Sequence, residues 1–276
     1  MTSASGTHPR LAVIGGSGFY EFLETPTDVV VSTPYGDPSA PVAVGDVGGQ
    51  PVAFLPRHGR DHEYPPHKIN YRANMWALRS LGVQQVLAPC AVGGLRPETQ
   101  PGTLVVPDQL VDRTTSRIQT FIDTGAAHAP FADPYCPHLR GALIAAAGAG
   151  ALDSGTMVVI EGPRFSTRAE SQSYARAGWT VINMTGHPEA VLARELGLCY
   201  ATIALVTDLD AGISAEDSVD QAQVFALFER HIGRLKGLLG DVVRVVAQEP
   251  VNCGCADWLD DVTLPFDLPG PARERA

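Results

Sequence analysis

Short apolar runs alternate with polar, glycine-rich turns along most of this chain. Runs of this kind predict buried strands, here over residues 10–14, 29–32, 42–47, 52–55, 86–92, 156–160 and 198–206. Apolar residues at helical spacing predict helices over residues 70–81, 139–151, 188–196 and 218–247, and a further helix that ends at Gly178. Because strands alternate with helices, we predict an α/β fold with a mixed central β-sheet flanked by helices.

No internal repeat and no linker divides the chain into two compositional halves. We therefore predict a single domain over residues 10–262. The small polar residues 1–9 are expected to form a disordered N-terminal tail, and residues 263–276 a C-terminal tail.

The composition of the 276 residues narrows the class of protein. Hydrophobic residues make up 45% and charged residues 18%, which fits a globular chain with a large core. The formal charge of −10 speaks against a nucleic-acid partner. No apolar run approaches the roughly 20 residues that span a bilayer, so we expect a cytoplasmic protein without a membrane partner.

Five cysteines do not form the pattern of a secreted disulfide framework. Cys253 and Cys255 are separated by one glycine, and a disulfide between such close neighbours is strained. A redox pair is conceivable there, but we interpret both as small packed thiols.

The segment 181–189 is the first candidate for chemistry. An apolar run ends in Asn183-Met184-Thr185, and a helix is expected to begin near Pro188 with Glu189 in its first turn. A loop between a strand end and a helix N-terminus is a common place for an α/β protein to hold a small anion.

Four other predicted strand ends also carry polar groups. They are Gly15-Gly16-Ser17-Gly18, Arg57-His58, Cys90-Ala91 and Asp208-Leu209-Asp210. Each alone is also compatible with a solvated turn, but such ends converge on one crevice in an open α/β sheet. His58 and His62 have the spacing of metal ligands, yet no carboxylate or thiol cluster accompanies them, so we expect no metal.

The collected groups divide into an anion-binding half and an acidic half. Hydroxyl, guanidinium, imidazole and backbone N–H groups suit inorganic phosphate. Carboxylates two residues apart on an extended chain point the same way and suit a basic nitrogen heterocycle. Attack by phosphate on a sugar carbon that carries a base would use both halves.

Five motifs occur in a fixed order along the chain and together resemble those of a known family. They are Ile-Gly-Gly-Ser-Gly, Arg-His-Gly-Arg-x-His, Glu-Gly-Pro-Arg-Phe-Ser-Thr-Arg-Ala-Glu, Asn-Met-Thr-x-x-Pro-Glu and Thr-Asp-x-Asp. From about Leu11 to Ala247 the chain resembles the 5'-methylthioadenosine phosphorylase branch of the trimeric purine nucleoside phosphorylases. The resemblance implies a purine nucleoside phosphorylase-like fold, a homotrimer, phosphate as co-substrate, and no metal or organic cofactor. It implies phosphorolysis of a 5'-substituted adenosine to adenine and a sugar 1-phosphate.

The resemblance also implies roles for individual residues. Asp208 and Asp210 would be catalytic at the purine. The phosphate site would comprise Ser17, Arg57, His58, Cys90, Ala91 and Thr185. Ribose and base would lie against Met184, Phe165, Ser166 and Asn183. The 5' pocket would be lined by His187, Gln221, Val224 and His128, the last lent by a neighbouring subunit.

Departures from the family pattern leave the 5' substituent open. Cys90 replaces a common threonine, Gly186-His187 replaces apolar residues, and Gln221 falls where aliphatic residues are usual. Methylthio is favoured, and a hydroxyl or another small group stays possible. Asp208 and Ser166 stand where the branch that acts on 6-oxopurines carries Asn and Glu, which favours adenine. The alternatives are a phosphorylase of 5'-methylthioinosine or of ordinary purine nucleosides, and a nucleoside-binding protein without catalysis.

Overall fold

Strand β1 (Leu11–Gly15) is buried along its whole length. We describe a computed structural model, which covers residues 8–16, 19, 22–211, 213, 221–249 and 251–271, without the side chains of residues 221 and 223. Ser17 and residues 1–7, part of the predicted N-terminal tail, lie outside these residues. Leu11 and Val13 face one apolar cluster, and Ala12 and Ile14 face another. A strand with both faces covered needs the continuous apolar run that the sequence shows.

Within the described residues, β1 belongs to a six-stranded sheet of order β12-β5-β1-β4-β3-β2. The other strands are β2 (Glu24–Val29), β3 (Val42–Val47), β4 (Gln50–Pro56), β5 (Gln85–Leu87) and β12 (Cys199–Ala201). β12, β5, β1 and β4 are parallel, whereas β3 and β2 continue the sheet antiparallel. The strand expected at residues 29–32 lies earlier, and Val30 beyond its end is exposed.

A second sheet of seven described strands has the order β8-β10-β11-β6-β13-β7-β9. Its strands are β6 (Cys90–Gly94), β7 (Leu104–Val105), β8 (Gln109–Arg113), β9 (Ala151–Leu152), β10 (Thr156–Ile160), β11 (Val181–Asn183) and β13 (Ala204–Leu209). Both parallel and antiparallel pairs occur in it. The fold is thus mixed α/β as predicted, with two sheets in place of one.

Two predicted strands are each divided between the sheets. Residues 86–92 form β5 in the first sheet and β6 in the second, and residues 198–206 form β12 and β13 in the same way. Pro89, which has no N–H for a ladder, lies at the first break. The two segments pass from the first sheet to the second side by side, because β12 pairs with β5 and β13 pairs with β6.

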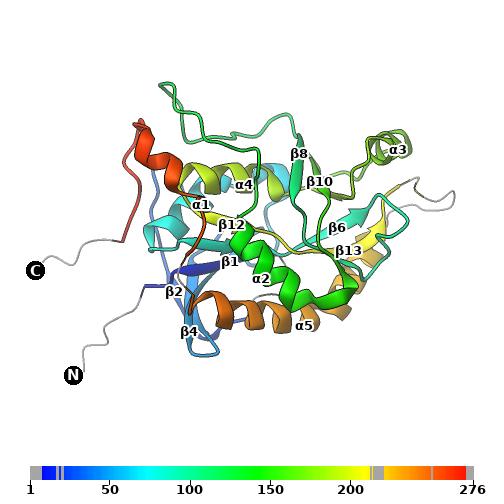
Figure 1. The fold of residues 1–276 in the computed structure, drawn as a ribbon, viewed down its shortest axis with the longest axis horizontal. Coiled ribbons are helices and arrows are strands. Elements are labelled where there is room, and N and C mark those ends of the chain that lie inside the picture. The colour runs from blue at the N-terminus through cyan, green and yellow to red at the C-terminus, as the bar shows by residue number, and fades with distance from the viewer. Residues whose placement is uncertain are drawn as a thin grey trace, which may run out of the picture.

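Helices cover the first sheet on both sides (Figure 1). α2 (Pro137–Ala147) and α5 (Gln221–Val246) lie on one side, and α1 (Tyr71–Ser80) and α4 (Gly186–Glu195) on the other. α3 (Arg168–Arg176) lies beside the second sheet. Short 3₁₀ turns cover Pro66–Lys68, Gly148–Gly150 and Asp257–Asp261.

The helix boundaries follow local signals in the sequence. Asn70 caps α1 by accepting a hydrogen bond from the Ala73 N–H, and Thr167 and Glu170 form a capping box at α3. His187 has non-helical backbone angles, so the regular part of α4 begins at Pro188, as predicted. In the described part of the chain, no helix is long and apolar enough to cross a bilayer.

The segment after α5 packs back onto the domain. Trp258 is buried and donates its indole N–H to the Arg194 carbonyl at 3.1 Å. Phe266, within the predicted C-terminal tail, lies with its ring centroid 5.7 Å from that of Trp76. The described part of the C-terminal segment therefore continues the packed structure to at least Phe266.

Candidate active site

A cavity of about 410 Å³ opens where β4, β6, β11 and β13 end or pass. Most of the predicted site residues line it: Arg57, His58, Cys90, Ala91, Phe165, Ser166, Asn183, Met184, Thr185, Asp208, Asp210 and Val224. Ser17 and the Gln221 side chain lie outside the described residues. The fold thus gathers residues from six separated stretches of sequence into one hollow.

Asp208 and Asp210 form the acidic part of the cavity. They are two residues apart near the end of β13, where a bulge follows Val206. Thr207 donates its hydroxyl to Asp208 Oδ2 at 2.8 Å. Burial raises the pKa of Asp210, and the hydroxyls of Ser171 and Ser166 oppose that rise. The pair therefore offers two carboxylates in different surroundings, one of them poised to hold a proton more readily than usual.

Gly93 on β6 is a site residue that the sequence did not reveal. A Cβ at this position would lie 3.2 Å from Asp208 Oδ1 and 3.3 Å from Asp210 Cβ, and only 2.8 Å from an Ile182 methyl group. The glycine lets the carboxylates approach the strand. Its only sequence signal was the paired glycines at the end of an apolar run.

The basic part of the cavity is built around Arg57, which is 2% exposed. Its Nε donates to Glu189 Oε1 at 2.5 Å, and its Nη2 donates to Glu189 Oε2 at 3.2 Å. The guanidinium also donates to the carbonyls of Ile14 and Pro89. Burial alone would lower the pKa of Arg57, but the Glu189 carboxylate raises it above its ordinary value.

Glu189 is the most important partner that the sequence reading missed. The sequence places it in the first turn of α4, where an acidic residue matches the helix dipole. It is 1% exposed and also accepts a hydrogen bond from the Tyr200 hydroxyl at 2.9 Å. Because it lies 132 residues from Arg57, no local pattern could have linked the two. The pair anchors the strand end after β4 to the start of α4.

His58 enters the cavity as a neutral imidazole. Burial and then the charge of Arg57 lower its pKa to about 4. Its Nδ1 lies 2.9 Å from the Tyr64 carbonyl, which can only accept, so Nδ1 carries the proton and Nε2 has a free lone pair. The ring stacks on His62 at 4.3 Å between centroids. A bound phosphate dianion would favour a second proton on this ring.

The hydrogen bonds of Cys90 are directed away from the cavity. Its backbone N–H donates to the Ile203 carbonyl at 3.1 Å, and its Sγ lies 3.5 Å from Thr202 Oγ1. Thr202 donates its single proton to the Ala88 carbonyl, so the Cys90 thiol is the donor in the contact between them. Burial raises the pKa of this thiol, which keeps it protonated. Cys90 therefore contributes shape to the cavity, while the polar contacts must come from its neighbours.

The loop that follows β11 is held by Asn183. The Asn183 Oδ1 accepts hydrogen bonds from the N–H groups of Thr185 at 2.7 Å and Gly186 at 2.6 Å, and its Nδ2 donates to the Ala91 carbonyl. Both ends of this amide are thus used to shape the loop. The result is that Met184 and Thr185 are presented to the cavity from a fixed turn.

Phe165 and Ser166 reach the cavity from the loop after β10. Phe165 is 37% exposed, while Ser166 is buried near Asp210. Gly162 in the same loop has a positive φ of 67°, and a Cβ there would lie 2.7 Å from Met184 Sδ. The loop can therefore approach Met184 closely only with glycine at this position.

Two histidines expected in the 5' pocket do not line this cavity. His187 is 4% exposed and turns towards Asp112, with Nε2 3.3 Å from the carboxylate. Burial lowers its pKa in spite of Asp112. His128 lies exposed on the loop between β8 and α2, beside a separate hollow of about 410 Å³ that Glu195 also lines. The resemblance implies a place for His187 in the 5' pocket, but its side chain is buried beside Asp112 and does not line the described cavity.

The chain is similar to known phosphorylases along most of its length. A family model described as "Phosphorylase superfamily" matches residues 10–244. An S-methyl-5'-thioadenosine phosphorylase of Mycobacterium tuberculosis is 59% identical over 260 residues, which cover 94% of this chain and 97% of the relative. A purine nucleoside phosphorylase of Streptomyces coelicolor is 52% identical over 279 residues, with coverage of 96% and 100%.

Solved structures give the same result for the fold. A methylthioadenosine phosphorylase from Schistosoma mansoni, solved in complex with adenine, superposes with a TM-score of 0.84. It is 37% identical, and the match covers 88% of this chain and 93% of that one.

Proposed function

This chain belongs to the phosphorylase superfamily, and from that premise we propose that it cleaves S-methyl-5'-thioadenosine with phosphate. The products would be adenine and 5-methylthioribose 1-phosphate, so the enzyme would be a pentosyltransferase with phosphate as co-substrate. The identity of 59% to a protein of that name over nearly its full length supports this substrate.

The observation that carries the proposal is the division of the cavity along β6. Cys90, at the start of this strand, lies beside the Arg57 side of the cavity, and Gly93 lies against Asp208 and Asp210. A strand advances about 3.3 Å per residue, so the two sides are separated by about 10 Å. We propose that phosphate and purine occupy these two sides and that the sugar lies between them.

The reaction follows from charges that develop in those two places. As the bond between C1' and purine N9 stretches, its electron pair moves to the purine and the sugar becomes oxocarbenium-like. A phosphate oxygen then forms the new bond to C1'. In this proposal Asp208 supplies or shares a proton at purine N7, and Asp210 accepts from the 6-amino group. General acid assistance of this kind contributes about 10²–10⁴-fold.

The remaining roles follow from position. We assign phosphate to Thr185, His58 and the Ala91 backbone, near the positive charge of Arg57. Ser17, outside the described residues, is assigned to phosphate by the resemblance alone. Met184 would lie under the ribose, and Phe165 would stack near the base. Holding both substrates in line in a cavity with few open polar groups would supply much of the remaining rate enhancement.

The adenine preference rests on Asp208 and Ser166. In this proposal Asp210 accepts from the 6-amino group that adenine carries. By the resemblance, the 6-oxopurine branch has Asn and Glu where this chain has Asp208 and Ser166. The second candidate is a phosphorylase of ordinary purine nucleosides. It is favoured by the 52% identity to the Streptomyces coelicolor protein, which is named a purine nucleoside phosphorylase.

A cytoplasmic homotrimer is also part of the proposal. Support comes from His128, which is exposed on its own chain and lies outside the cavity it was expected to close. A neighbouring subunit could place this loop over the 5' end of the nucleoside. Sedimentation of the purified chain at three times its monomer mass is the expected result, and a monomer with full activity would contradict it.

The deciding experiment measures phosphate-dependent base release from methylthioadenosine, methylthioinosine, adenosine and inosine. We expect methylthioadenosine to have the highest kcat/KM. Faster turnover of the two 6-oxopurine substrates would overturn the base assignment. Faster turnover of adenosine would overturn the 5' assignment. Binding without cleavage of any of the four would leave a nucleoside-binding protein as the answer.

A further inference from the structure

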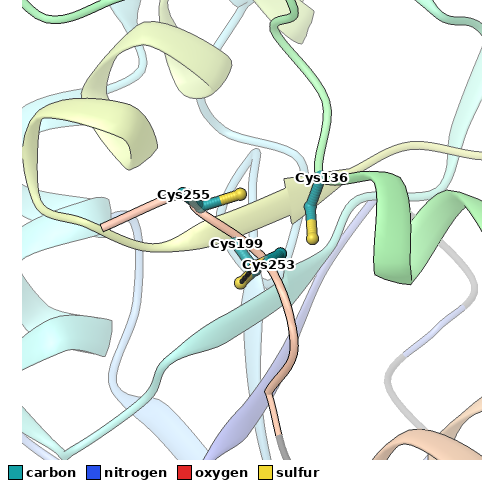
Figure 2. Close-up of side chains that lie close together, drawn as sticks. All are labelled: Cys136, Cys199, Cys253 and Cys255. Atoms are coloured by element: carbon teal, nitrogen blue, oxygen red, sulfur yellow. Dashed lines mark hydrogen bonds between the residues drawn. The ribbon is translucent and has the colours of Figure 1, made fainter. Parts of the chain in front are cut away.

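Four cysteine side chains from distant parts of the chain converge on one point (Figure 2). Cys136 immediately precedes α2, Cys199 begins β12, and Cys253 and Cys255 lie in the segment after α5. All four Sγ atoms lie within 4.8 Å of one another, and the Cys199 and Cys253 sulfurs are 3.2 Å apart. None of the four lines the candidate active site, which Cys90 alone among the cysteines reaches.

We propose that these four cysteines form a structural zinc site that fastens the C-terminal segment to the domain. In a tetrahedral zinc–thiolate site each Zn–S bond is about 2.3 Å, so the sulfurs lie about 3.8 Å apart. This value lies between the 3.2 Å that separates the Cys199 and Cys253 sulfurs and the 4.8 Å within which all four sulfurs lie. The sequence reading of Cys253 and Cys255 as packed thiols considered only these two neighbours, whereas the fold brings two further thiols to them.

The mutual convergence favours a metal over disulfides. A disulfide joins two sulfurs at about 2.05 Å and places no demand on a third or fourth cysteine. A tetrahedral ion requires every ligand to approach the same centre. Four cysteines and no other metal-ligating side chain make up the described cluster, which is the ligand set of a closed structural zinc site.

Three of the four cysteines are buried, and Cys253 is half-buried. Cys136, Cys199 and Cys255 are 0%, 3% and 4% exposed and belong to the apolar cluster that α2 and α5 cover. The N-terminus of α2 begins directly after Cys136, and the positive end of a helix stabilises thiolate charge. On binding, four thiols release four protons, and the resulting zinc–tetrathiolate group carries a net charge of −2.

The site would determine how the segment after α5 is attached. Cys253 and Cys255 lead into the short turn Asp257–Asp261, where Trp258 docks on α4 through the Arg194 carbonyl. Leu259 and Ala256 pack against Gly197, in the turn before β12. A metal that joins Cys199 to Cys253 and Cys255 would therefore strengthen the same attachment of this segment to the domain.

The first test is metal content and metal exchange in the full-length protein. Protein purified under anaerobic, metal-free conditions after growth with zinc should contain about one zinc ion per chain by mass spectrometry of the elements. After removal of zinc with a strong chelator under reducing conditions, added Co²⁺ should give the thiolate-to-cobalt and intense d–d absorption of a tetrahedral site. Chelation should also lower the melting temperature, and added Zn²⁺ should restore it.

Matched variants locate the site. The double variant Cys253→Ser/Cys255→Ser should lose the zinc, whereas Cys90→Ser, the matched change outside the cluster, should keep it. Where the double variant fails to fold, the cobalt spectrum of the unmodified protein still decides. Zinc retained by a folded double variant would overturn the assignment. A reduced wild-type protein that binds neither Zn²⁺ nor Co²⁺ would also overturn it. The same holds if only Cys90 of an anaerobic preparation reacts with a thiol reagent, both before and after chelation.

Discussion

We expect that breaking the buried ion pair between Arg57 and Glu189 strongly lowers the free energy of unfolding. The variant Glu189→Gln tests this expectation. The substitution keeps the shape of the side chain and removes its charge. Arg57 and Glu189 are 2% and 1% exposed, so the guanidinium would be left as an uncompensated buried cation. The new amide N–H₂ would also face a donor, since Glu189 now accepts from both Arg57 and Tyr200.

Removing one partner of a buried pair costs about 3–5 kcal/mol. With an m-value of about 3 kcal/mol/M, the urea midpoint of unfolding should fall by about 1–1.7 M. The assay is urea unfolding of the variant and the wild type, followed by circular dichroism in phosphate-free buffer at equal protein concentration. Phosphate is excluded because a ligand bound to the folded state would stabilise it.

Two further variants separate charge burial from loss of a carboxylate in general. Glu98→Gln makes the same change at an exposed pair, where Arg96 Nη1 and Glu98 Oε1 are 3.7 Å apart, and should cost no more than about 1 kcal/mol. Arg57→Met/Glu189→Leu replaces both buried charges and should recover much of the stability. Without the Arg57 charge it should not recover phosphorolysis. A Glu189→Gln protein within about 1 kcal/mol of the wild type would refute the reasoning.

Three further predictions address the reaction and its pH dependence. Asp208→Asn should lower kcat for methylthioadenosine by about 10²–10⁴-fold with little change in the KM for phosphate, and unchanged kcat would remove Asp208 from the chemistry. Thr185→Ala should raise the KM for phosphate by about ten- to a hundred-fold, as expected for a lost hydrogen bond to an anion, and an unaltered phosphate dependence would place Thr185 outside that site. For His58, the pKa of about 4 in the folded chain lies below its ordinary value of 6.5, so the unfolded chain takes up the proton first as the pH falls. Stability should therefore decline between about pH 6.5 and 4, with a contribution of up to about 3 kcal/mol from this residue. His58→Asn, measured by urea unfolding across that range, should remove this part of the decline, and identical pH profiles would show that His58 does not cause it.

The loop after β11 illustrates how one amide organises a candidate site. Asn183 uses its oxygen for two backbone N–H groups and its nitrogen for the Ala91 carbonyl. The resemblance groups Asn183 with the residues that touch ribose or base, but its hydrogen bonds tie the loop to β6. The neighbouring Met184 and Thr185 then face the cavity, where we propose that sugar and phosphate meet.

Local patterns of residues are enough to predict most of the helices and strands and the chemistry at their ends. Periodic apolar runs placed β1, β3 and β10 within one residue of their boundaries, and Pro188 marked the regular start of α4. Burial on both faces and helix capping are read from neighbouring residues, so these features need no knowledge of the fold. The motifs also named most of the residues that line the cavity.

Which separated segments meet becomes apparent only from the packed fold. It divided residues 86–92 and 198–206 between two sheets, paired Arg57 with Glu189, turned His187 towards Asp112 and gathered four cysteines at one point. Hydrophobic periodicity reports that a residue is buried, but it carries no information about the partner across the core. Pairs such as these lie far apart along the chain, and their energy arises only when the sheets and helices are packed.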